Sequence, residues 1–171
     1  AAIVRFGGVI RLGGVFTAEF TEFGSVKVTN DANAAALGEM IYGGGKGMNN
    51  FVMITLGTGL GSGIIVNGDL VYGHDGFAGE LGHTTVVPHG RVCGCGSLGH
   101  LEAYCSATGI KRTVFEVLAK YNNSESPLAN VPYNDMTAKL VFDAAETGDP
   151  IALEEFETTG ELLGRSLADT V

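Results

Sequence analysis

The chain has 171 residues and a net charge of −9, with a sequence pI near 4.8. Because the negative charge is spread along the chain without a basic stripe, it argues against nucleic-acid binding through this segment. No apolar run reaches the length of a membrane span, while 45% hydrophobic residues suffice for a folded core. The three cysteines are odd in number and follow no signal peptide, so we expect a reduced, cytoplasmic chain and not a secreted disulfide framework.

The first part of the chain alternates short apolar runs with glycine-rich turns. A short helix is expected near residues 16–23, followed by a strand at Ser25–Asn30, where β-branched residues alternate. A helix is predicted from about Asp31. The glycine run Gly43–Gly47 interrupts this helix and indicates a hinge or a domain boundary.

Strands are predicted next. Phe51–Leu56 is apolar enough to be a buried strand, and Gly61–Val66 is expected to pair with Asp69–Tyr72. The connecting Asn67-Gly68 dipeptide is a strong short-range signal for a hairpin. Residues 74–100 are irregular and contain all four histidines and two of the three cysteines.

Helices dominate the remainder. They are expected from about Leu101, after Thr108, after Thr137 and from Pro150, with Asp149 as the cap of the last helix. The helical spacing of four apolar residues predicts that they share one face of this last helix, namely Leu153, Phe156, Leu163 and Leu167. The order of strand, helix, antiparallel strands and helices predicts an α/β protein with two lobes meeting at residues 43–47.

The run TLGTGLGSG (55–63) joins two strands and precedes no helix, so it is neither a P-loop nor a dinucleotide-binding motif. Its glycines, including Gly57, Gly59 and Gly61, could expose successive backbone N–H groups to a phosphate, and Thr58 adds a hydroxyl. An ordinary glycine-rich hairpin explains the same pattern.

Asn30 and Asp31 follow the strand at 25–30, where α/β folds often place ligand-binding side chains. A carboxylate there could accept the proton of an attacking hydroxyl. An aspartate at the start of a helix is more often a cap, and the local pattern alone favours that interpretation.

Four nitrogen and sulfur donors lie within eighteen residues: His83, Cys93, Cys95 and His100. Zinc is held by four such donors in a tetrahedron, and the intervening glycines allow the chain to fold around it. Unliganded thiols and exposed histidines are the alternative. The two other histidines, His74 and His89, are expected on the surface.

Four sequence blocks together resemble the ROK (repressor, open reading frame, kinase) family of sugar kinases and repressors. Their order and spacing match that family, and the similarity extends over residues 25–110. The blocks are NDANAAALGE (30–39), TLGTGLGSG (55–63), GFAGELGH (76–83) and CGCGSLGHLE (93–102).

This resemblance implies roles for residues of the presumed sugar site. Asp31 resembles the catalytic base, which overturns the local preference for a cap. Asn30, Glu80, His83 and Glu102, together with Asp31, correspond to residues that bind sugar hydroxyls. The implied reaction transfers the γ-phosphoryl group of ATP to a hexose hydroxyl, with glucose as the first candidate.

The resemblance also implies a phosphate site and a zinc site. Thr58 and Gly59, flanked by Gly57 and Gly61, lie in the loop that holds ATP phosphates with Mg²⁺. His83, Cys93 and Cys95 match zinc ligands of a structural site. The family usually has a third cysteine where this chain has His100, so the histidine is inferred as the fourth ligand by chemical equivalence, with Cys105 a buried free thiol.

The implied fold is the actin-like ATPase (ribonuclease H-like) architecture. Residues 1–45 would end the first lobe, and 46–171 would form most of the second. The family's Asp-x-Gly-Gly-Thr motif and its adenosine-binding segment are absent, so the fold is expected to be incomplete at both ends. The implied partners are a hexose, ATP and a second copy in a homodimer. Alternatives within the resemblance are a sugar-sensing repressor, a non-catalytic sugar-binding module, or a kinase for N-acetylglucosamine, N-acetylmannosamine, allose or fructose.

Overall fold

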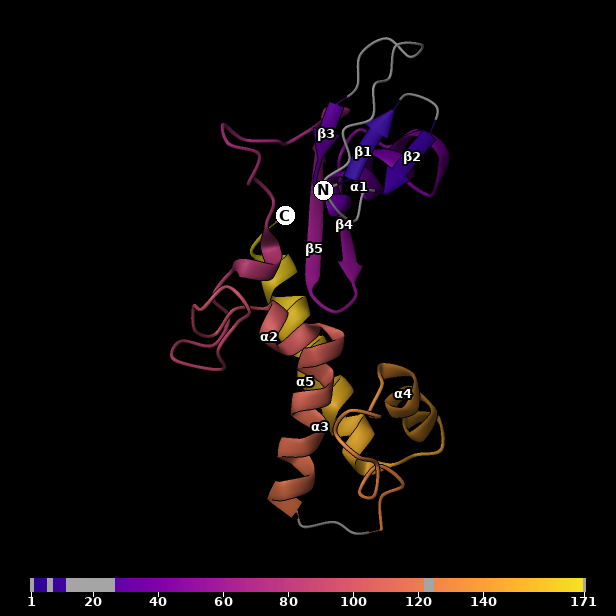
Figure 1. Ribbon diagram of the computed structural model, residues 1–171, viewed down its shortest axis with the longest axis vertical. Helices are drawn as coiled ribbons and strands as arrows, with labels where there is room; N and C mark the ends of the chain where they lie inside the picture. The colour runs from indigo at the N-terminus through magenta and orange to yellow at the C-terminus, as the bar shows by residue number, and fades with distance from the viewer. Residues whose placement is uncertain (1, 6–7, 12–26, 122–124, 171) are drawn as a thin grey trace. The chain divides into compact units, whose positions relative to one another are not determined.

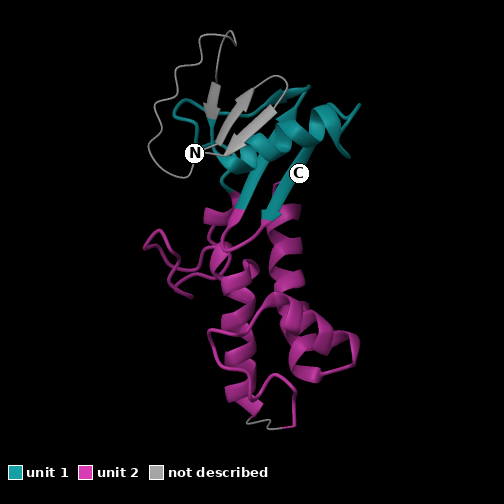
Figure 2. Cartoon of the chain, turned by 45° about the vertical axis from the view of Figure 1, so that its right-hand side comes forward, with its two compact units in different colours: residues 1–55, 61–80 teal, residues 56–60, 81–171 magenta. Residues whose placement is uncertain are grey.

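The structure, a computed structural model, describes residues 2–5, 8–11, 27–121 and 125–170 (Figure 1). The helix expected near residues 16–23 lies outside the described residues. The chain divides into two compact units, which Figure 2 colours separately. Unit 1 comprises residues 1–55 and 61–80, and unit 2 comprises residues 56–60 and 81–171. The lobe boundary expected between residues 45 and 46 stays a prediction.

Unit 1 contains a small antiparallel sheet with the strand order β2-β1-β3. Its strands are β1 (Ala2–Arg5), β2 (Gly8–Arg11) and β3 (Lys27–Thr29), and β1 pairs antiparallel with both neighbours. Helix α1 (Asp31–Tyr42) follows β3 after one residue. The predicted succession of strand and helix is therefore confirmed; Asn30 is the helix cap and not part of the strand, and residues 25 and 26 lie outside the described residues.

A second sheet has the order β4-β5-β6, formed by β4 (Phe51–Leu56), β5 (Leu60–Val66) and β6 (Asp69–Leu70). The predicted hairpin is confirmed: β5 and β6 pair antiparallel across Asn67 and Gly68, whose φ angles of 53° and 83° suit a tight hairpin turn. The prediction that β4 is buried is wrong. This strand is half-buried because it forms an edge of the three-stranded sheet.

Helix α1 approaches β5 closely through small residues. A Cβ atom placed on Gly63 would lie 2.6 Å from the Cβ of Ala36, and one placed on Gly61 would lie 2.8 Å from the Cβ of Ala32. Both alanines are buried. These two glycines of the glycine-rich run therefore allow the helix to pack on the strand, a role that the sequence pattern did not distinguish from phosphate binding.

Unit 2 is mainly helical. It begins its second segment with the 3₁₀ turn η1 (Leu81–His83), followed by α2 (Glu102–Cys105), α3 (Ala107–Tyr121), α4 (Ala138–Glu146) and α5 (Pro150–Ala168). Helices α3, α4 and α5 enclose a hydrophobic cluster. Its buried members are Ile110, Val114, Val117, Leu128, Met136, Val141, Ala144, Ile151 and Ala152.

The predicted N-terminus of α5 is confirmed, because the Asp149 side chain accepts a hydrogen bond from the Ala152 backbone at 2.9 Å. The predicted apolar face of α5 is confirmed only in part: Phe156 packs against the hydrophobic cluster, and Leu163 and Leu167 are half-buried. Leu153 is 50% exposed, and the buried positions are Ile151, Ala152, Glu155, Thr159 and Ser166. The reason is that α5 contacts α2, α3 and α4, so the covered side includes polar positions that the apolar pattern does not mark.

Over the described ranges, no helix combines the length and the apolar character required to cross a bilayer.

Candidate functional site

At the junction of β3 and α1, the neighbouring polar residues Asn30 and Asp31 have different structural roles. Asn30 has an extended backbone, and its Oδ1 accepts a hydrogen bond from the Asn33 backbone N–H at 2.7 Å. Asn30 is thus the helix cap, and the local preference for Asp31 as the cap is wrong. Asp31 is the first helical residue and its side chain is exposed.

Asn30 also connects this junction to a second predicted sugar-binding residue. Its Nδ2 donates a hydrogen bond of 3.0 Å to Oε1 of Glu80, fifty residues further along the chain. The Asn30 side-chain amide therefore accepts a hydrogen bond from the helix backbone through its oxygen and donates one to the Glu80 carboxylate through its nitrogen. Unit 1 accordingly brings Asn30, Asp31 and Glu80 to one helix end, where the positive end of the helix dipole favours negatively charged groups.

The glycine-rich loop of unit 2 is attached to the start of α3. The Ala107 backbone N–H donates to the Gly57 carbonyl at 2.9 Å, and the Thr108 hydroxyl donates to the Thr58 carbonyl at 3.2 Å. The Thr58 side chain is exposed. These bonds fix the backbone of the loop and leave its hydroxyl-bearing tip accessible to a ligand.

Two N–H groups of this loop are already used within the protein. The Gly57 N–H donates to the Gly59 carbonyl at 3.0 Å, and the Leu60 N–H donates to Oε2 of Glu102 at 3.1 Å. A Cβ atom on Gly59 would collide with the same Glu102 oxygen. Gly59 therefore permits a carboxylate to approach the backbone, a role that sequence reasoning missed because the partner lies more than forty residues away.

The four predicted metal ligands lie together in unit 2. The ligand atoms of His83, Cys93, Cys95 and His100 are all within 4.8 Å of one another. His100 Nδ1 lies 3.3 Å from both His83 Nδ1 and Cys95 Sγ, and Cys93 Sγ lies 3.8 Å from His83 Nδ1. Tetrahedral zinc with bonds of 2.0 to 2.3 Å would separate its donors by about 3.3 to 3.8 Å. The donor set and its spacing therefore fit zinc.

The backbone of this loop explains how the donors converge. Antiparallel bridges pair Thr85 with His100 and Val92 with Leu98. Gly99 lies between the two bridged positions with a φ of 74°, a conformation that glycine adopts most readily. We refer to residues 83–100 as the metal loop.

The three thiols have different surroundings. Burial raises the pKa of Cys93, whereas a hydrogen bond from the Ser97 backbone lowers the pKa of Cys95. Burial raises the pKa of Cys105 to about 11, and its Sγ lies 3.5 Å from the Thr159 carbonyl. Cys105 is the buried free thiol that was predicted, and it lies outside the donor cluster.

Glu102, a predicted sugar-binding residue, connects the metal loop with the glycine-rich loop. Its Oε1 accepts a hydrogen bond from the Cys93 thiol at 3.4 Å, while its Oε2 accepts the Leu60 N–H. Glu102 is half-buried at the start of α2. His74 and His89 are exposed, as expected, and neither belongs to the cluster.

Known proteins with similar sequences include both enzymes and regulators. The chain is 46% identical over 145 residues to the glucokinase of Halalkalibacterium halodurans. This alignment covers 84% of this chain and 44% of that protein. It is 34% identical over 141 residues to the DNA-binding transcriptional dual regulator NagC of Escherichia coli, covering 82% of this chain and 34% of the regulator.

A solved structure also matches this chain. The crystal structure of a ROK family glucokinase from Streptomyces griseus, in complex with glucose and AMPPNP, superposes with a TM-score of 0.74 at 41% sequence identity. The match covers 84% of this chain and 47% of that one, so the chain spans about half the length of the glucokinases it matches. The α/β class predicted from the sequence is confirmed. The model of the ROK family matches residues 21–171, and the chain therefore belongs to the ROK family.

Proposed function

We propose that the full-length protein phosphorylates a hexose with ATP, with glucose as the first candidate substrate. The observation that carries this proposal is that Asn30 and Asp31 have different roles at the start of α1. Because Asn30 caps the helix, the exposed carboxylate of Asp31 is available to accept a proton from a sugar hydroxyl. The similarity to glucokinases, one of which was solved with glucose and AMPPNP, supports the same reaction.

In the proposed mechanism, Asp31 removes the proton of the attacking hydroxyl as the γ-phosphoryl group is transferred. Asn30 and Glu80 orient the sugar through hydroxyl contacts, and their mutual hydrogen bond fixes both side chains before the sugar binds. A carboxylate that already accepts one hydrogen bond retains lone pairs for a sugar hydroxyl.

The glycine-rich loop is proposed to hold the phosphates of ATP. Thr58 contributes an exposed hydroxyl, and the backbone at Gly57, Gly59 and Gly61 surrounds it. Since the Gly57 N–H is bonded to the Gly59 carbonyl, we assign the main phosphate contacts to Thr58 and Gly59. When bound, Mg²⁺ would neutralise charge on the phosphoryl oxygens.

The metal cluster is proposed to hold a structural zinc ion through His83, Cys93, Cys95 and His100. Four protein donors close the coordination sphere, which is typical of structural and not of catalytic zinc. The role of this site would be to stiffen the loop next to Glu102. His83 and Glu102 are then proposed to bind sugar hydroxyls from a fixed backbone.

A sugar-sensing repressor is the second candidate, because the chain is also similar to NagC. A repressor requires only the residues that contact the sugar, whereas a kinase also requires Asp31 and Thr58 for phosphoryl transfer. Both of these residues are present and exposed. For the complete protein we propose the two-lobed actin-like architecture, a homodimer and a cytoplasmic location.

A coupled assay for ADP release tests the proposal. The full-length protein would be supplied with fixed ATP and Mg²⁺ and with a panel of glucose, N-acetylglucosamine, N-acetylmannosamine, allose and fructose. A kinase releases ADP in a sugar-dependent manner, and the panel identifies the sugar. Sugar binding without ADP release would favour a repressor or a binding module.

A further inference from the structure

One arginine of the metal loop, Arg91, forms several hydrogen bonds and an ion pair with the neighbouring helices. Arg91 lies two residues before Cys93, and its side chain is 13% exposed. Its Nε and Nη2 donate to the two carboxylate oxygens of Glu116 on α3, at 3.0 and 2.6 Å. This two-pronged arrangement fixes the plane of the guanidinium group as well as its position.

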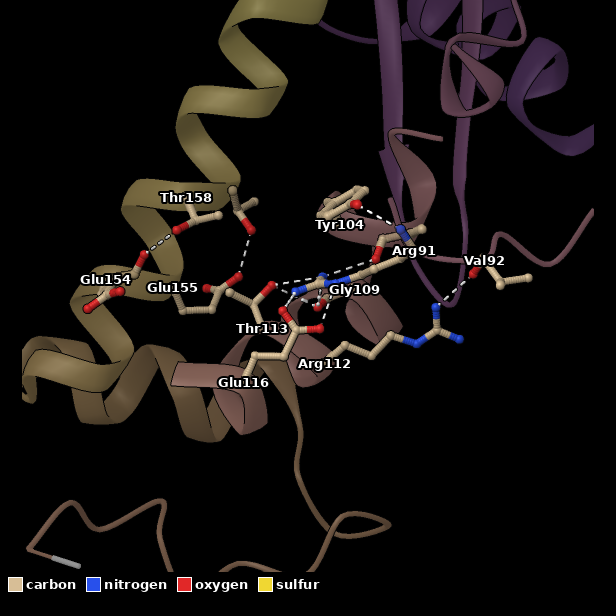
Figure 3. A network of polar contacts seen from close by, with 12 residues as sticks. Arg91, Val92, Tyr104, Gly109, Arg112, Thr113, Glu116, Glu154, Glu155 and Thr158 are labelled. Atoms are coloured by element: carbon tan, nitrogen blue, oxygen red, sulfur yellow. Dashed lines mark hydrogen bonds and ion pairs between the residues drawn. The ribbon is translucent and has the colours of Figure 1, made fainter. Parts of the chain in front are cut away.

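The remaining contacts of Arg91 join the loop to α2 and α3 (Figure 3). Nη1 donates to the Ala103 carbonyl at 3.2 Å, to the Gly109 carbonyl at 3.3 Å and to the Thr113 hydroxyl at 3.0 Å. The Ala103 carbonyl belongs to the short helix α2, and the other two acceptors belong to α3. One side chain therefore bridges three elements.

Tyr104 contacts both the backbone and the side chain of Arg91. Its hydroxyl accepts the Arg91 backbone N–H at 2.8 Å, and its ring lies 4.5 Å from the guanidinium carbon. Tyr104 is itself 8% exposed. The backbone and the side chain of Arg91 are both fixed, so this position of the loop cannot move without breaking several bonds at once.

We propose that Arg91 is a positioning residue for the metal site. It fastens the metal loop to α2 and α3 and thereby holds Cys93 and Cys95 near their ligating positions before a metal binds. The inference rests on the proposed zinc site. A preorganised loop loses less conformational freedom on binding, so the same four donors bind more tightly. Losing a group that orients the ligands of a metal site typically weakens metal affinity about 10- to 100-fold, and Arg91 would orient Cys93 and Cys95 through the backbone of the loop.

Arg112 provides a matched control in the same region. It donates one hydrogen bond of 2.9 Å, from Nη1 to the Val92 carbonyl, and so contacts the residue next to Arg91 with an identical functional group. A single bond at a more exposed position constrains the loop much less. If positive charge near the cysteines were the important property, the two arginines would have similar effects on metal affinity.

The test compares zinc affinity in the full-length protein, measured by competition with a chromogenic chelator of known zinc affinity. Wild type should bind one zinc per chain. Arg91→Gln should weaken binding at least about tenfold, and Arg112→Gln should stay within about threefold of wild type. Arg91→Lys keeps the charge but cannot form the two-pronged contact, so it should resemble Arg91→Gln.

Unfolding of the metal-free variants separates positioning from general support. If Arg91→Gln lowers the metal-free Tm while zinc affinity stays within threefold of wild type, Arg91 only supports the helices and the inference is wrong. If Arg91→Gln does not fold, Glu116→Gln replaces it, since this change keeps the arginine and removes the charge of its partner. Unchanged zinc affinity in Glu116→Gln would then overturn the inference. A wild-type protein that binds no zinc would overturn the metal site as well.

Discussion

The β3–α1 junction and the metal loop hold the side chains of the proposed sites in different ways. At the junction, a strand of three residues leads directly into a helix, and one capping bond at Asn30 sets the position of Asp31. The metal loop has two isolated bridges and, after His83 at the end of η1, no helix or strand in its eighteen residues, and its order depends on side chains such as Arg91.

This difference indicates what each region requires. Residues at the junction are positioned by regular secondary structure and the packing of α1 on β5, so they should not depend on a metal. The metal loop buries few apolar side chains, and bound zinc would supply stabilisation that packing does not. The chemistry of the proposed reaction would then belong to the stable region, and part of the sugar contacts to the metal-dependent one.

The largest effect is expected from removing a proposed metal ligand. His100→Ala should weaken zinc binding by at least about a hundredfold, because the binding free energy of a structural zinc site, about 10 to 16 kcal/mol, depends on all of its ligands. Cys105→Ala is the matched control and should retain one zinc per chain, since Cys105 lies outside the cluster. Metal content after dialysis measures both, and reversed outcomes would reassign the fourth ligand to Cys105.

The next largest effect is expected at the junction. Asp31→Asn should lower kcat at least about a hundredfold, which is the usual range for losing a general base. Sugar affinity and zinc content should stay near the wild-type values, because the amide preserves the shape of the side chain. Asp69→Asn, at an exposed aspartate of the β5–β6 hairpin, should leave kcat unchanged. An Asp31→Asn variant that retains a tenth of wild-type kcat would remove Asp31 from the mechanism.

Hydrogen exchange tests the proposed difference in metal dependence directly. Chelating the zinc should increase exchange of backbone amides in the metal loop by about tenfold or more, as the loop opens locally. Amides of α1, such as those of Ala34 and Ala36, should exchange at the same rate with and without metal. If the exchange rates increased equally in the metal loop and in α1, zinc would stabilise both regions and the proposed difference between them would be wrong.

The smallest effect is expected at Glu155 on α5. This side chain is fully buried; its Oε1 accepts the Thr159 hydroxyl at 2.6 Å, and among the described residues its Oε2 has no hydrogen-bond partner. Burial raises its pKa above the ordinary value of 4.5. The neutral form is therefore favoured in the folded state, and stability is lost as the pH rises above the pKa of the unfolded chain.

Glu155→Gln removes this dependence because the amide is neutral at every pH. The substitution should raise Tm at pH 7 by about 2 °C, with a smaller gain at pH 4.5, where the wild-type carboxyl holds its proton more of the time. Glu157→Gln changes an exposed glutamate of the same helix and should have no such pH-dependent effect. A loss of stability in Glu155→Gln that is constant with pH would show that Glu155 is ionised and paired.

Local patterns predicted the regular elements of this fold well. The Asn67-Gly68 hairpin and the start of α5 at Asp149 follow from short-range chemistry, and both are confirmed. The clustering of the four metal donors was expected from their spacing along a glycine-rich loop. Each of these features depends on residues close together in the sequence.

Features that depend on distant partners were not predictable from the sequence. The buried side of α5 includes Glu155 because three helices surround it, which an apolar pattern cannot reveal. Gly59 faces Glu102, and Arg91 faces Glu116, across separations that have no local signature. The division between Asn30 as cap and Asp31 as exposed carboxylate required the backbone angles at the junction.

Whether the full-length protein transfers a phosphoryl group to a sugar can be read from the fate of that group. ATP labelled with ¹⁸O in its γ-phosphoryl group would be incubated with the protein, Mg²⁺ and the preferred hexose, and the products analysed by mass spectrometry. If the protein is such a kinase, the labelled phosphoryl group appears on the sugar, and Asp31→Asn reduces this transfer at least about a hundredfold. Label recovered only in inorganic phosphate, or remaining in ATP while the sugar is bound, would contradict the proposed transfer.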